Sequence, residues 1–136
     1  MNPKDQVCRM EVDNLALPCS DETAMRVPYI VIHNNEDPDD MYCLHTGRSC
    51  SHENLAEELP LSPTSTIVGG GLLSLDRHGD TWNMTMATGS YKGSIPPWMQ
   101  DHFAMQIKQT LALKGMQVDT IETVASNGNM NRHWSR

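Results

Sequence analysis

The most constraining feature of this chain is an amphipathic segment at residues 97–114. Four apolar residues recur there at every fourth position and form one stripe: Met99, Phe103, Ile107 and Leu111. Gly115 stands where a glycine that ends a helix belongs. A helix with a single apolar stripe buries that stripe against another element. The sequence therefore predicts a helix that begins at Pro97 and packs on one face of a sheet.

The remaining core carries strand patterns. Residues 27–34 (VPYIVIHN) are β-branched and aromatic, and residues 41–47 (MYCLHTG) are the expected hairpin partner beyond the turn NEDPDD. A short helix is predicted from the N-cap candidate Ser51 to Pro60. Further strands are expected at 65–76, at 81–88 after the turn RHGD, and at 116–124. This ββαββαβ order predicts an α+β fold, a single mixed or mostly antiparallel sheet with two helices.

The chain of 136 residues has the size of one domain. Residues 1–25 show no sustained period and are predicted to form an irregular arm. Residues 26–124 form the predicted domain, and the polar, Gly/Asn-rich residues 125–136 form a flexible tail.

Charge and composition exclude several classes of protein. The net charge of −7 and the absence of a basic run argue against nucleic-acid binding and against anionic membrane surfaces. No apolar run approaches the ~18 residues that span a bilayer. The N-terminal segment MNPKDQVCRMEVDN has no secretory pattern, so we expect a cytoplasmic protein with free thiols. No cofactor is predicted, and a protein partner or a homo-oligomer stays open.

Residues 41–55 bring together four side chains of the types that bind zinc: Cys43, His45, Cys50 and His52. Their spacing is Cys-x-His in both pairs, whereas zinc sites are typically built from Cys-x₂-Cys or His-x₃₋₅-His pairs. We therefore predict no metal site, and a zinc site made of these four residues is the alternative.

Two further segments are unusual. Gly69, Gly70 and Gly71 interrupt an apolar strand, which indicates either a bulge or a close approach by a ligand or a neighbouring backbone. The loop GSYKGSIPP then leads into the long helix, whose positive end attracts anions. It offers glycines, hydroxyls and a cation, namely Gly89, Ser90, Lys92, Gly93 and Ser94. The loop is either an anion cradle or a solvated connection.

The order of these pieces resembles the Janus/phosphohistidine phosphatase family over about residues 27–124. The matching segments are YIVIHN, YCLH, IVGGGLLSL and TGSYKG. The resemblance implies a phosphoryl hydrolase in which His45 transfers the proton and the 89–93 loop holds the phosphoryl oxygens. On this reading the three glycines and Ser94 line the anion site, and Arg48 lies at its rim.

The chain departs from the family at three cationic positions, one of which is the arginine before the histidine, which has no match in the acidic segment NNEDPDDMY. The family's lysine in the first strand falls opposite Pro28, and its arginine after the three glycines is Leu72. Phosphoryl transfer depends on cations that neutralise charge in the transition state. Two functions therefore stay open: a phosphohistidine-phosphatase-like hydrolase, and a non-catalytic module of the same fold that binds a small anion or a protein. Either anion site requires His45 and the 89–94 loop to lie on one side of the sheet, within about 10 Å, so that one phosphate reaches both.

Overall fold

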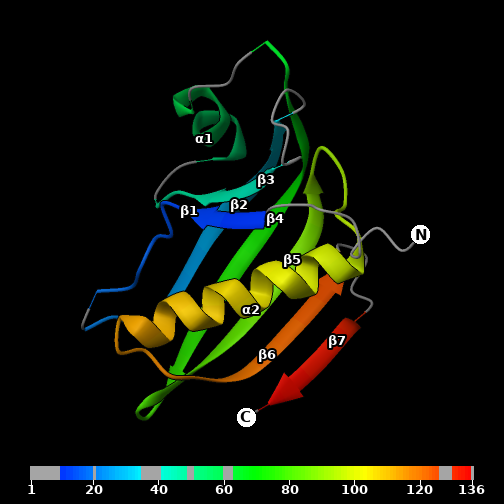
Figure 1. Ribbon diagram of the computed structural model, residues 1–136. Coiled ribbons are helices and arrows are strands. Elements are labelled where there is room, and N and C mark those ends of the chain that lie inside the picture. Colours follow the sequence, from blue (N-terminus) through cyan, green and yellow to red (C-terminus); the bar gives the residue numbers. More distant parts are fainter. Residues whose placement is uncertain are drawn as a thin grey trace.

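In the computed structural model, seven strands form one mixed sheet and a helix packs on each of its faces (Figure 1). The structure describes residues 10–19, 21–34, 41–48, 51–59, 63–125 and 130–135. In chain order the elements are β1 (Met10–Asp13), β2 (Ala24–Asn34), β3 (Tyr42–Thr46), α1 (His52–Glu58), β4 (Ser65–His78), β5 (Thr81–Tyr91), α2 (Pro97–Leu113), β6 (Val118–Ala125) and β7 (Met130–Ser135).

The strand order across the sheet is β1-β3-β2-β4-β5-β6-β7. The β1–β3 and β5–β6 pairs are parallel, and the other pairs are antiparallel. A parallel pair cannot be closed by a tight hairpin, and α2 is the connection that carries the chain from β5 to β6. The predicted α+β class, with one mixed sheet and two helices, is confirmed.

The helix α2 covers one face of the sheet, as its stripe predicted (Figure 1). Met99, Phe103, Ile107 and Leu111 are all buried in the main core. Alternate residues of the central strand β2 join this core: Met25, Val27, Tyr29 and Val31. A second, smaller cluster lies on the opposite face, where Ile30 and Ile32 meet Leu55 of α1. Because both faces of β2 are covered, its sequence is a nearly continuous apolar run.

The start of α1 and the end of α2 lie where the local sequence predicts them. The Ser51 side chain caps α1 by accepting a hydrogen bond from the Asn54 amide at 3.2 Å. Gly115 follows α2 with φ of 87°. The amide of Gly115 donates to the Ala112 carbonyl and that of Met116 to the Leu111 carbonyl, the pair of bonds that ends many helices. Among the described residues, no helix is long and apolar enough to cross a membrane.

The two ends of the chain differ from the prediction. The segment expected to be an irregular arm contains β1 and the start of β2, and the expected flexible tail contains β7. Both β1 and β7 are edge strands, each paired with one neighbour. The four-residue β1 is held by its neighbours: the Gln106 side chain donates to the Met10 carbonyl at 2.6 Å, and the Thr46 hydroxyl donates to the Asn14 carbonyl at 3.0 Å. A strand this short is defined by such tertiary partners, so its own pattern did not reveal it.

Candidate functional site

His52, the first residue of α1, reaches the glycine segment of β4. Its Nε2 lies 2.7 Å from the Gly71 carbonyl oxygen, and its ring stacks on Tyr91 with centroids 4.9 Å apart. A carbonyl oxygen only accepts hydrogen bonds, so Nε2 carries the hydrogen. The neutral ring then keeps its lone pair on Nδ1. The fold therefore holds His52 in the tautomer in which Nδ1 is the base.

The three glycines allow neighbouring backbone to approach β4. A Cβ on Gly71 would collide with the Ala87 carbonyl, and a Cβ on Gly69 would collide with the Gly93 carbonyl. The register between β4 and β5 also shifts between Gly70 and Gly71. Both structural roles considered for the glycines, a bulge and a close approach, are thus present, and the approaching group is backbone.

The loop after β5 completes the surroundings of His52. Lys92 follows Tyr91 with φ of 62°, and its Nζ lies 5.5 Å from the Tyr91 ring centroid. The side chains of Ser90, Lys92 and Ser94 are exposed. We use the name His52 site for His52, the Gly71 carbonyl, Tyr91 and Lys92. This site combines an imidazole of defined tautomer with a movable cation at the surface.

His45 lies on the same face of the sheet as Tyr91, but the two residues are separated across the strands of the sheet. The register pairs His45 with Ile30, Ile30 with Gly70, and Gly70 with Tyr91. Three strand spacings of about 4.8 Å separate His45 from Tyr91, roughly 14 Å in all. This exceeds the separation of about 10 Å that one bridging phosphate allows. The structure brings His52 rather than His45 to the loop.

The sequence did contain a signal for His52. It follows the N-cap residue Ser51, so its side chain leaves α1 in the first turn of the helix. The sequence indicates for His52 only a helix start or a zinc ligand, because its contact with Gly71 depends on how α1 docks.

Arg48, expected at the rim of the anion site, is engaged elsewhere. It donates to Glu22 Oε2 and to the Leu17 carbonyl, both at 2.8 Å, and contacts the sulfur of Met25. Its hydrogen bond lowers the pKa of Glu22 from 4.5 to about 2. Leu17 and Glu22 belong to the segment before β2, and Met25 belongs to the core beneath α2. Arg48 therefore joins this segment to the core.

The start of α2 offers fewer free amides to an anion than a helix without prolines. Its N-cap is Pro96 and its first residue is Pro97, and proline has no N–H. The amides of Met99 and Gln100 both donate to the Pro96 carbonyl. Ile95, just before the helix, is buried in the core on the α2 face, opposite the His52 site. The start of α2 therefore gives little support to the predicted cradle.

A second group of chemically active side chains lies at the β1–β3 edge. One ligand atom from each of Asp13, Cys43 and His45 lies within 4.8 Å of the others. These residues line a hollow of about 270 Å³. Burial lowers the pKa of His45 and, with Asp13 and Glu11 nearby, raises the pKa of Cys43 to about 11. The structure thus joins two of the four zinc-ligand candidates with Asp13, which the sequence did not single out.

The other two zinc-ligand candidates, His52 and Cys50, do not join this group in the described structure. The side chain of His52 is bonded to β4, which β2 separates from β3. Cys50 lies outside the described residues.

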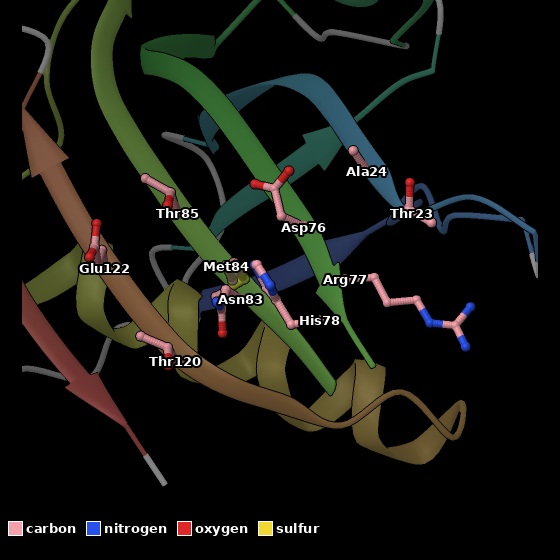
Figure 2. A pocket seen from close by; sticks show the side chains of 10 residues that line it. All are labelled: Thr23, Ala24, Asp76, Arg77, His78, Asn83, Met84, Thr85, Thr120 and Glu122. Atoms are coloured by element: carbon pink, nitrogen blue, oxygen red, sulfur yellow. The ribbon is translucent and has the colours of Figure 1, made fainter. Parts of the chain in front are cut away.

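A hollow of about 510 Å³ lies on the open part of the sheet face opposite α2. Figure 2 shows side chains from β4, β5 and β6 around it, including Asp76, Asn83 and Glu122. Asp76 pairs with Arg26 at 3.3 Å, and both side chains are about half exposed. His78 is exposed at the turn, as expected from the sequence. This hollow holds none of the residues of the His52 site.

Comparisons with family models, curated proteins and solved structures found no match to this chain. The fold and the His52 site therefore define a class only: an α+β domain with a histidine of fixed tautomer beside a glycine- and serine-containing loop.

Proposed function

We propose that this chain is a phosphoryl hydrolase resembling phosphohistidine phosphatases, with His52 acting on the phosphoryl group in place of His45. The observation that carries the proposal is the contact between His52 Nε2 and the Gly71 carbonyl at 2.7 Å. That contact assigns the hydrogen to Nε2 and leaves Nδ1 to accept a proton.

The chemistry requires a base and a cation. Nδ1 accepts a proton from water while the water oxygen forms a bond to phosphorus and the phosphorus–nitrogen bond of a phosphoramidate breaks. The proton on Nδ1 then passes to the leaving nitrogen, and the histidine returns to its starting state. Lys92, whose Nζ lies over the Tyr91 ring that stacks on His52, supplies positive charge for the phosphoryl oxygens.

The competing function is a non-catalytic module that binds a small anion or a protein through the same fold. Pro28 and Leu72 stand where the resembled family has cations, and Arg48 is paired with Glu22. These features reduce the positive charge available to stabilise a transition state. They favour binding without turnover, whereas the fixed tautomer of His52 favours hydrolysis.

Hydrolysis of phosphoramidate and of a phosphohistidine peptide separates the two functions. We expect the wild type to hydrolyse both, and His52→Ala to lose about 10²–10⁴-fold in rate, the usual contribution of a general base. His45→Ala is the matched control and should retain the wild-type rate, because it lies roughly 14 Å from Tyr91 across the sheet. Equal rates for the wild type and His52→Ala would contradict the hydrolase.

Phosphate titration followed by NMR tests the alternative. Shifts of amides in the 89–94 loop that are weakened by Lys92→Ala, in a protein without turnover, would support the anion-binding module. Absence of both turnover and shifts would contradict an anion site of either kind.

A further inference from the structure

The β1–β3 edge carries a cluster that the His52 site does not use. In the parallel register, Glu11 lies opposite Cys43 and Asp13 lies opposite His45. The intervening residues Val12 and Leu44 pack into the core beneath α2, so these four residues belong to the other face. All four line the same hollow of about 270 Å³.

The arrangement within the cluster is compact. His45 Nδ1 lies 3.9 Å from Asp13 Oδ2, and the ligand atoms of Asp13, Cys43 and His45 all lie within 4.8 Å of one another. Ligand atoms bound tetrahedrally to zinc at about 2.0–2.3 Å are about 3.3–3.8 Å apart. Small side-chain rotations would therefore bring the three atoms to ligand spacing.

The histidine nitrogen is a second, independent observation. His45 Nδ1 is buried and has no hydrogen-bond partner among the residues that the structure describes, and the His45 side chain is only 12% exposed. A buried polar atom without a partner costs free energy, and such atoms are few in folded proteins. A metal ion in the hollow would satisfy this nitrogen.

We propose that Asp13, Cys43 and His45 bind one zinc ion through a carboxylate oxygen, the Sγ sulfur and Nδ1. A thiolate and an imidazole select zinc over the hard cations calcium and magnesium, which prefer oxygen ligands. Three protein ligands leave one tetrahedral position for water or for a further side chain. The carboxylate of Glu11 beside the hollow and the net charge of −7 both favour a cation.

The ion would tie the edge strand β1 to β3. Asp13 belongs to a strand of four residues that pairs with a single neighbour, while Cys43 and His45 belong to the next strand of the sheet. A metal bond between the two strands adds to the few hydrogen bonds that hold β1. Metal binding to the folded chain therefore stabilises the fold.

Zinc and cobalt(II) titrations of the metal-free full chain test this site. We expect one equivalent of zinc to bind and to raise the melting temperature. Cobalt should give the absorption bands of a tetrahedral thiolate complex. Cys43→Ser and His45→Gln should each lower zinc affinity at least tenfold and remove the melting shift, and Asp13→Asn should weaken binding.

Cys19→Ser and Cys50→Ser are the matched controls, because neither cysteine is one of the three proposed ligands. Both should keep the wild-type affinity. The proposal would be overturned by the absence of stoichiometric binding, by wild-type affinity in Cys43→Ser, or by loss of binding in Cys50→Ser. None of these readouts depends on phosphoryl chemistry.

Discussion

At the scale of single residues, Gly71 serves the fold and the site together. Its carbonyl oxygen fixes the tautomer of His52, and its missing Cβ lets the Ala87 carbonyl of β5 pass close by. Tyr29 depends on the same point, because its buried hydroxyl donates to the Ala87 carbonyl at 2.7 Å. A side chain at position 71 would therefore disturb the β4–β5 pairing beneath the loop.

We predict that Gly71→Ala lowers the free energy of unfolding by about 1–3 kcal/mol or more, the usual cost of overpacking a closed site. Gly93→Ala is the matched control, since its Cβ would meet only the Val68 carbonyl at an ordinary 3.5 Å. Urea denaturation of both variants measures the difference. Equal stability of Gly71→Ala and Gly93→Ala would show that the strands can move apart at no cost.

At the scale of elements, α2 has six buried residues, against one in α1, and its stripe is the clearest local pattern. Phe103 is fully buried, and Gln100 on the same helix donates to the Met86 carbonyl at 2.7 Å and the Val124 carbonyl at 3.2 Å. The amide of Gln100 thus joins α2 to β5 and β6, the parallel pair that the helix connects. Apolar packing and one polar bridge hold this crossover together.

We predict that Phe103→Ala costs about 3–5 kcal/mol of stability, because it leaves a cavity among well-packed neighbours. Leu113→Ala, on the same helix at 88% exposure, should change stability by no more than about 0.5 kcal/mol. Thermal and chemical denaturation measure both values. Similar losses for the two variants would contradict the assignment of Phe103 to the main core.

At the scale of the whole molecule, an ion pair links the end of β3 to the segment before β2. Arg48, just after β3, binds Glu22 and the Leu17 carbonyl, and Glu22 Oε1 accepts a hydrogen bond from the Cys19 amide at 2.6 Å. The Arg48 guanidinium and the Cys19 amide hold the pKa of Glu22 at about 2, against an ordinary value of 4.5. This lowered pKa makes part of the global stability depend on pH.

The pair stabilises the folded chain above pH 4.5, where Glu22 is ionised in both the folded and unfolded states. As the pH falls, the unfolded chain takes up this proton first, so the contribution declines and is lost near pH 2. We predict that Glu22→Gln is less stable than the wild type at pH 7 and that the two converge as the pH falls from 4.5 to 2. Denaturation at several pH values measures the difference. A constant difference across this range would contradict the assignment.

The sequence by itself determined the fold class and the elements between β2 and β6, whereas β1 and β7 were not recognised. The stripe of α2, the cap at Ser51, the glycine at 115 and the apolar run of β2 are local features, because helix and strand periods depend on residues only a few positions apart. Only the tertiary structure decided which histidine meets the loop and which side chains share the β1–β3 edge. His52 contacts Gly71, 19 residues away, through the docking of α1, and Asp13 reaches His45 through the pairing of a strand too short to be recognised. These positions depend on register and packing between distant segments, which local periodicity does not specify.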